Sequence, residues 1–189
     1  MVEENLKKIY KLNPNVYPWK NRKYIDRKIG SSHYGEISQR GTEILMDKFS
    51  DYFNKDMVFY DIGSGLGKMV LHVGLTVNPR KSIGIEYSPP RHKGAIHLKN
   101  QYAPSTDNIE FFNMAFQECD ISDATVVYCD NTLLPGEVCK EVYDKVPKNC
   151  LYLFKRLGYN PDEITETIHQ ENGIPRTYLH DFIYWLIKE

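Results

Sequence analysis

The stretch that decides the fold is Tyr60-Asp61-Ile62-Gly63-Ser64-Gly65-Leu66-Gly67-Lys68. The apolar residues that lead into it, from Met57 onward, predict a buried strand, and residues 66–76 after it predict a helix. Glycines at such a junction let the backbone turn tightly and approach a ligand, and a helix N-terminus favours an anionic group. The stretch therefore predicts a ligand site at the end of the first strand of a sheet.

Two common nucleotide sites fit this glycine spacing poorly. A nucleoside triphosphate loop is disfavoured because Gly63 and Gly67 are one residue too close, and Met69 replaces the hydroxyl residue that meets magnesium. A dinucleotide fingerprint is disfavoured because Lys68 occupies the place of its third glycine, and because Asp61 would lie near a pyrophosphate.

The third possibility resembles the D-x-G-x-G-x-G motif of S-adenosylmethionine-dependent methyltransferases. The matching residues are Asp61, Gly63, Gly65 and Gly67. The methionine end of that cofactor is a zwitterion beside a sulfonium, so a carboxylate at Asp61 would favour its ammonium, and Lys68 could meet its carboxylate. Glu86 ends the next apolar run, 25 positions after Asp61, where an acid can accept both ribose hydroxyls.

An alternation of strand and helix patterns surrounds this motif. Strands are predicted over residues 57–62, 82–86, 108–112, 125–129 and 150–155, and helices over 36–49, 66–76, 90–102 and 136–145. Such an order indicates βαβ units with a parallel sheet. Residues 164–168 and 178–187, with a turn at Asn172-Gly173 between them, predict an antiparallel pair at the sheet edge. The fold class is therefore α/β, resembling the seven-stranded, Rossmann-like class I methyltransferase sheet with a C-terminal antiparallel hairpin.

The charge is distributed unevenly along the chain. The net charge is −1, yet the segment from Lys7 to Lys28 holds eight basic residues and a single acid. We expect residues 1–33 to form a basic, irregular or partly helical arm, and residues 34–189 to form the methyltransferase domain. A basic arm favours a polyanionic partner, and a solvated surface is the alternative. The residues that would meet DNA phosphates are Lys20, Arg22, Lys23, Arg27 and Lys28.

Several classes of protein are disfavoured by the sequence. Its start does not resemble a signal peptide, and no apolar run reaches the roughly 18 residues that span a bilayer. The four cysteines form no C-x-x-C pair, so we expect reduced, buried thiols, an intracellular setting and no metal site.

Three motifs outside the glycine stretch narrow the family. They are Tyr34-Gly35-Glu36-Ile37-Ser38, the run from Asp130-Asn131 to Val138, and Tyr178-Leu179-His180. Together they resemble the non-SET histone lysine methyltransferases named for disruption of telomeric silencing, over about residues 34–180. The resemblance implies methyl transfer from S-adenosylmethionine to a lysine of a core histone in the nucleosome, and a nuclear location (or a viral factory, if the chain is a minimal viral member).

The resemblance also implies roles for particular residues. Those expected around the cofactor are Tyr34, Glu36, Asp61, Gly63, Gly65, Lys68, Glu86 and Phe116. Those expected to face the methyl group and the incoming lysine are Asp130, Asn131 and Tyr178.

The chain departs from the family pattern at three of these places. Lys68 stands where the family usually has glutamine, Ala115 replaces an acid before Phe116, and Asp130 replaces the first asparagine of the lysine channel. Two alternatives therefore stay open: a methyltransferase for a non-histone protein or a nucleic acid, and a non-catalytic binding module. A base amino group is disfavoured as acceptor, because neither prolines nor an aromatic residue follow Asn131.

Overall fold

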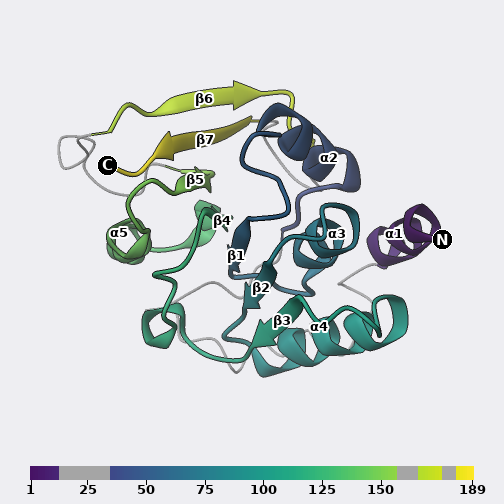
Figure 1. The fold of residues 1–189 in the computed structure, drawn as a ribbon. Helices are drawn as coiled ribbons and strands as arrows, with labels where there is room; N and C mark the ends of the chain where they lie inside the picture. The colour runs from purple at the N-terminus through teal and green to yellow at the C-terminus, as the bar shows by residue number, and fades with distance from the viewer. Residues whose placement is uncertain (13–34, 157–165, 176–181) are drawn as a thin grey trace.

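The computed structural model describes residues 1–12, 35–156, 166–175 and 182–189, and these form a mixed seven-stranded sheet flanked by helices (Figure 1). The strand order is β3-β2-β1-β4-β5-β7-β6, with β7 antiparallel to both of its neighbours. The strands are β1 (Val58–Ile62), β2 (Lys81–Ile85), β3 (Ile109–Phe112), β4 (Val126–Cys129), β5 (Leu151–Phe154), β6 (His169–Asn172) and β7 (Phe182–Ile187). The helices are α1 (Val2–Lys11), α2 (Gln39–Lys48), α3 (Lys68–Thr76), α4 (Pro89–Tyr102) and α5 (Gly136–Lys145), with short 3₁₀ turns η2 (Phe116–Glu118) and η3 (Asn131–Leu133). The predicted α/β fold with a C-terminal antiparallel pair is confirmed.

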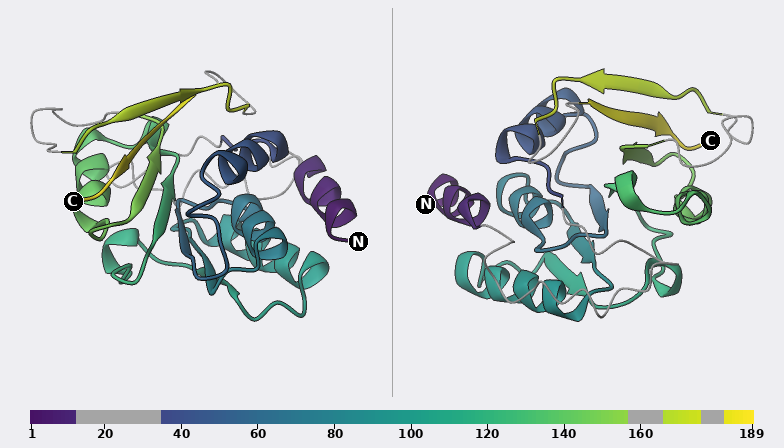
Figure 2. Two further views of the ribbon diagram at one scale, coloured as in Figure 1. Left: turned by 45° about the horizontal axis from the view of Figure 1, so that its top comes forward. Right: turned by 180° about the vertical axis from the view of Figure 1, so that it is seen from behind.

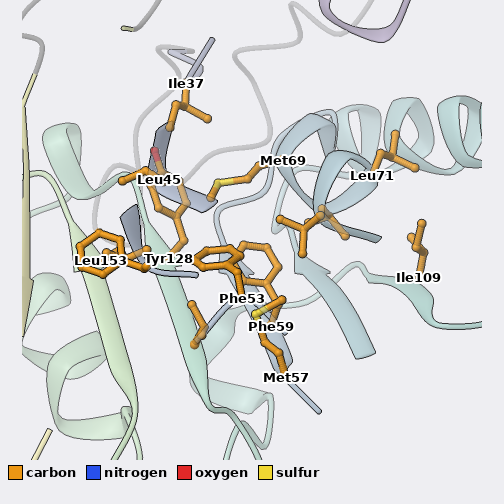
Figure 3. Close-up of a cluster of buried hydrophobic side chains, with 14 of the residues drawn as sticks. Ile37, Leu45, Phe53, Met57, Phe59, Met69, Leu71, Ile109, Tyr128 and Leu153 are labelled. Atoms are coloured by element: carbon orange, nitrogen blue, oxygen red, sulfur yellow. The ribbon is translucent and has the colours of Figure 1, made fainter. Parts of the chain in front are cut away.

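Both faces of the sheet are covered, and the strands divide their side chains between them. Phe59 of β1 points into the cluster formed with α1 to α4, whereas Val58 and Tyr60 point into the cluster formed with α5. Figure 2 shows these helices on opposite sides of the sheet, and Figure 3 shows Phe59 packed beside Phe53 and Met57. Because successive strand residues face opposite sides, continuous apolar runs such as β4 are fully buried.

The N-terminal residues form a regular helix that packs on the domain. Leu6 and Ile9 of α1 are buried in the same cluster as α3, whereas Lys7 and Lys8 pair with Glu3 and Glu4 on its exposed side, each at 2.6 Å. Part of the positive charge expected in the arm is thus balanced locally. The boundary at residue 33 and the phosphate-binding residues from Lys20 to Lys28 lie outside the described residues and stay predictions.

The first strand of the C-terminal pair lies later than predicted. Residues 166–168 are not in a strand, residues 164–165 lie outside the described part, and β6 begins at His169. The reason is that β6 is the exposed edge of the sheet and buries neither face, so its sequence lacks the apolar alternation used to place it. Gly173, directly after β6, has a positive φ of 77°, and residues 176–181 of the connection to β7 lie outside the described part, so the turn at Asn172-Gly173 stays a prediction.

The C-terminus is fastened to the sheet through a buried carboxylate. Glu166 accepts hydrogen bonds from the Tyr143 hydroxyl and from the backbone N–H of Glu189, and Lys188 Nζ lies 3.5 Å from its Oε1. The same Nζ lies 3.2 Å from the centre of the Tyr143 ring. Burial alone would raise the pKa of Glu166, but these donors lower it to about 2.

We expect Glu166→Gln to lower the melting temperature at pH 7. A carboxyl whose pKa falls on folding contributes stability above its unfolded value of 4.5, and this contribution is lost as the pH drops toward 2. The difference in melting temperature between the wild type and the variant should therefore shrink between pH 4.5 and 2. Glu137→Gln, on the exposed side of α5, is the control, and a difference that stays constant over this range would contradict the interpretation.

Candidate functional site

A crevice is expected where β1 and β4 separate at their carboxyl ends. The chain leaves β1 and β2 toward helices on one face and leaves β4 toward α5 on the other, which makes this the topological switch point of the sheet. Ile62 of β1 is in register with Ile85 of β2 and with Cys129 of β4. The residues that follow directly, Gly63, Glu86 and Asp130, therefore lie at one edge, as the sequence predicts.

The glycine loop between β1 and α3 has a conformation that favours glycine at three positions. Gly63, Gly65 and Gly67 have positive φ values of 79°, 56° and 71°. A side chain on Gly67 would also meet the ring of Phe111 at 2.3 Å, so this glycine brings the start of α3 against the sheet. Gly63 has open space where a Cβ would stand and is exposed, so the loop presents bare backbone on that side.

One side chain of this loop has an unsatisfied polar atom. Ser64 is nearly buried and its hydroxyl has no hydrogen-bond partner within the described structure. Its backbone N–H and that of Gly63 are both donated to the Ile85 carbonyl, at 3.0 and 2.9 Å. A Cβ on Gly84 would lie 2.7 Å from the Ser64 Oγ, so this hydroxyl is directed toward β2.

Glu86 is held by backbone donors at the end of β2. Its Oε2 accepts from the N–H of Gly65 at 2.8 Å, and its Oε1 accepts from the N–H of Ser88 at 2.7 Å. Burial raises the pKa of Glu86, and the positive charge of Arg91 opposes this. Two fixed N–H donors orient the carboxylate and leave lone pairs for hydroxyl groups of a ligand.

Asp61 is a buried carboxylate that receives no hydrogen bond from the described residues, with only 5% of its surface exposed. Burial and the nearby charge of Glu86 raise the pKa of Asp61 from 3.8 to about 8. A desolvated carboxyl group with no donor of its own binds a cation strongly once the cation displaces its proton.

Lys68 and Glu36 are joined to each other. Lys68 Nζ lies 2.7 Å from Glu36 Oε2, and it also donates to the backbone carbonyl of Leu12 at 2.7 Å. Lys68 is 4% exposed, and it begins α3 directly after Gly67. Both residues were predicted to surround the cofactor; the structure brings them together beside the glycine loop and adds Leu12, which no sequence signal indicates.

On the β4 side, Asn131 and Asp130 have different environments. Asn131 is fully buried: its Oδ1 accepts from the N–H groups of Lys155 and Arg156, at 2.9 and 2.8 Å, and its Nδ2 donates to the Arg156 carbonyl at 2.7 Å. Asp130 is half-buried, and its Oδ1 accepts from the Thr132 hydroxyl at 2.7 Å and caps η3 by accepting from the Thr132 backbone N–H at 3.4 Å. Asn131 therefore fastens the end of β4 to the end of β5, and its catalytic role stays a prediction.

The remaining predicted residues are placed only in part. Phe116 is buried in η2 on the α5 face, after Ala115, and its contact with the cofactor stays a prediction. Tyr34 and Tyr178 lie outside the described residues.

The segments next to Tyr34 and Tyr178 are fastened together in the described structure. Ser38 donates its hydroxyl and its N–H to the Pro175 carbonyl, at 2.8 and 3.1 Å. A Cβ on Gly41 would lie 2.4 Å from the same oxygen. No local sequence pattern predicts this contact, because the two residues are 137 positions apart.

Other kinds of site receive no support from the described part of the chain. All four cysteines are buried free thiols, as predicted. Within residues 1–12, 35–156, 166–175 and 182–189, no three acidic, histidine or cysteine residues are grouped to hold a metal ion. None of the helices described is long and apolar enough to cross a membrane.

The charges of this site match a ligand that carries two cations and one anion. Three acidic side chains, Asp61, Glu86 and Glu36, lie around the glycine loop together with Lys68. S-adenosylmethionine carries an ammonium, a sulfonium and a carboxylate, along with ribose hydroxyls. Asp61, Lys68 and Glu86 have the chemistry to hold the ammonium, the carboxylate and the ribose respectively, so the residues present fit this cofactor.

The fold and the site define a class I, S-adenosylmethionine-dependent methyltransferase. Comparison with known proteins gives the family: residues 15–149 match the model described as "Histone methylation protein DOT1", and the chain belongs to this family. Its cofactor is therefore S-adenosylmethionine.

The individual relatives share only low sequence identity with this chain. A protein-lysine N-methyltransferase of Saccharolobus islandicus (strain REY15A) is 28% identical over 116 residues, which cover 59% of this chain and 71% of that protein. Among solved structures, an RNA methyltransferase from Salinibacter ruber has a TM-score of 0.62 at 22% identity and covers 82% of this chain and 94% of its own. A precorrin-6y C5,15-methyltransferase from Geobacter metallireducens has a TM-score of 0.60 at 12% identity, covering 92% and 100%. The two structures show that the fold is shared.

We expect cofactor binding to release a proton that Asp61 holds in the free protein. With a pKa of about 8, Asp61 is largely protonated at pH 7, and the incoming ammonium favours its charged form. Affinity should rise from pH 6 to pH 8, and calorimetry at pH 7 in two buffers of different ionisation enthalpy should detect up to about one proton released. Asp61→Asn should abolish this release and weaken binding.

The same variant should raise the melting temperature of the ligand-free protein. A carboxyl whose pKa rises on folding lowers stability as the pH rises from its unfolded value of 3.8 toward 8, and the amide avoids this penalty at pH 7. A ligand-free Asp61→Asn protein that melts below the wild type, together with pH-independent binding in the wild type, would contradict this account.

Substitution of Asn131 should lower stability much more than substitution of Asp130. Asn131→Ala leaves the N–H groups of Lys155 and Arg156 and the carbonyl of Arg156 without their partner, so it should cost about 1–3 kcal/mol of stability. Asp130→Asn keeps the half-exposed cap and should change stability by less than about 0.5 kcal/mol. Urea unfolding measures both, and equal losses would contradict the assignment of Asn131 as a structural clamp.

Proposed function

We propose that the protein transfers a methyl group from S-adenosylmethionine to the side-chain nitrogen of a lysine in a core histone of the nucleosome. The observation that carries the proposal is the buried, donor-free carboxylate of Asp61 beside the glycine loop and Glu86. Membership of the DOT1 histone methylation family and the lysine-methylating relative from Saccharolobus support a protein lysine as the acceptor.

The bound cofactor would supply an electrophilic methyl group, and this chain's residues would position it. Asp61 would hold the ammonium and Glu86 the ribose hydroxyls, so that the methyl group would lie near the carboxyl ends of β1 and β4. The acceptor lysine has an ordinary pKa near 10.4, so it would lose a proton to solvent before its nitrogen takes the methyl group and S-adenosylhomocysteine leaves. Asp130 is the acid that directly follows β4, and we assign it the role of holding the ammonium at the entrance.

The basic residues from Lys20 to Lys28 are the proposed contact with nucleosomal DNA, and the nucleus is the compartment that this acceptor implies. Phosphate contacts of this kind would make nucleosome binding strongly salt-dependent. A lysine of a non-histone protein is the second candidate acceptor. It is favoured by the Saccharolobus relative, which is named for protein lysine in general, and by Asp130 in place of the family's asparagine.

A methylation assay with labelled cofactor on nucleosomes, free core histones and naked DNA tests the proposal. We expect label on a histone lysine in nucleosomes, located by mass spectrometry, and none with Asp61→Asn. The triple variant Lys20→Glu, Arg22→Glu, Lys23→Glu should lower nucleosome methylation at least about tenfold, because it removes phosphate contacts, yet leave cofactor affinity unchanged.

The outcomes separate the candidates. Label on unrelated proteins but on no histone would replace the histone acceptor with the second candidate. Transfer to DNA, or a wild-type protein that binds neither the cofactor nor S-adenosylhomocysteine, would overturn the proposal.

A further inference from the structure

Lys68 has one more hydrogen-bond donor than its described partners use. An ammonium group has three N–H donors. One is directed to Glu36 and one to the Leu12 carbonyl, both at 2.7 Å; the Nζ also lies 6.0 Å from the centre of the Tyr10 ring, and no oxygen or nitrogen acceptor among the described residues takes the third N–H. Since Lys68 is 4% exposed, water has little access to that third donor. A buried ammonium at the start of α3 with one N–H that lacks a hydrogen-bond acceptor favours binding of an anionic group there.

The Leu12 carbonyl joins this cation to the N-terminal helix. Leu12 caps α1, and the preceding turn of α1 carries Tyr10, whose hydroxyl lies 3.0 Å from Thr42 Oγ1 and 3.2 Å from His72 Nδ1. Burial lowers the pKa of His72 to about 4, so its ring is neutral and can hydrogen-bond to Tyr10 without a charge. The C-terminal end of α1 is therefore held to α2 and α3 by polar contacts that converge near the glycine loop.

The other end of α1 is held independently. Asn5 Nδ2 donates to the Tyr102 carbonyl at the end of α4, at 3.0 Å. Asn5 thus offers a way to loosen α1 that leaves Lys68 and the glycine loop untouched. Figure 1 shows α1 beside α3, at the margin of the molecule.

We propose that Lys68 is a positioning residue that couples cofactor occupancy to the docking of α1. The carboxylate of the cofactor's methionine end accepts the third N–H, so that one ammonium joins the ligand, Glu36 and the end of α1. The ligand's identity rests on the proposed function; the connection between Lys68 and α1 does not. Coupling of this kind is reciprocal: the ligand stabilises the docked helix, and docking of the helix raises affinity for the ligand.

The charge of Lys68 is what makes the connection strong. Without it, Glu36 loses an ion pair and the Leu12 carbonyl loses a donor in a largely buried place, and both losses are destabilising. Glutamine, the residue that the family usually has here, offers two N–H donors and no charge, so it can satisfy two of three acceptors at most. The coupling should therefore decrease from lysine to glutamine to methionine.

Hydrogen exchange of the full-length protein measures the docking of α1. In the wild type, saturating S-adenosylhomocysteine should slow amide exchange in residues 2–11 severalfold. In Lys68→Met these amides should exchange faster without ligand and should not respond to it, with Lys68→Gln in between. Lys81→Met is the matched control, because it removes a partly exposed ion pair to Asp123 elsewhere and should leave α1 unchanged.

A double-mutant cycle measures the reciprocal effect. Asn5→Ala should weaken binding of S-adenosylhomocysteine about threefold to tenfold in the wild-type background, by a smaller factor in Lys68→Gln, and have no further effect in Lys68→Met. The two Lys68 variants provide the same comparison, so the milder one decides the matter should the other fail to fold.

Three results would overturn the coupling, and they differ from failure of the proposed function. The first is α1 exchange in Lys68→Met that equals the wild type. The second is wild-type α1 exchange that ignores bound ligand. The third is an Asn5→Ala protein with loosened α1 and unchanged affinity. A wild-type protein that binds no ligand would remove the proposed function and the coupling with it, whereas the ligand-free comparison of Lys68→Met with Lys81→Met would still show whether Lys68 holds α1.

Discussion

Burial of negative charge at the carboxyl ends of β1 and β2 is the constraint on which the rest of the site depends. Asp61 has no donor among the described residues, and burial raises the pKa of both Asp61 and Glu86. A sequence selected for stability alone would place neutral side chains here, because desolvating a carboxylate is unfavourable. The backbone N–H groups that hold Glu86 and the lysine that pairs with Glu36 reduce this penalty without removing it. The remaining imbalance is what a ligand with two positive charges relieves.

The sequence predicts this part of the molecule well because its determinants are local. The spacing from Gly63 to Gly67 requires a left-handed backbone at three alternate residues, and the apolar runs around it have the length of buried strands. The βαβ pattern indicates a parallel sheet, and the observed strand order places Glu86 and Asp130 at the same edge. The sequence pattern places the edge strand β6 too early, because this strand buries neither face and its four residues show no alternation of apolar and polar side chains.

The partners of the site residues are less predictable, because they come from distant parts of the chain. Lys68 and Glu36 are 32 positions apart, and the Leu12 carbonyl is a backbone atom whose position leaves no trace in residue type. Asn131 shows the same limit in another form. The role that the family resemblance implies for Asn131 stays a prediction, but its three side-chain hydrogen bonds to the backbone after β5 can be found only once the two strands are paired.

The site residues fall into two groups: those with unsatisfied hydrogen-bonding capacity and those whose hydrogen bonds are directed to the protein backbone. Asp61 and the Ser64 hydroxyl have unsatisfied hydrogen-bonding capacity in the described structure, and Asp61 is the group that the cofactor's ammonium would pair with. Asn131 and Ser38, by contrast, direct their side-chain hydrogen bonds to backbone groups of distant segments and so hold those segments together. Lys68 belongs to both kinds, because two of its donors hold the protein and one remains for the ligand. Because the same ammonium would bind the cofactor and the end of α1, ligand binding at Lys68 also changes how firmly α1 is held.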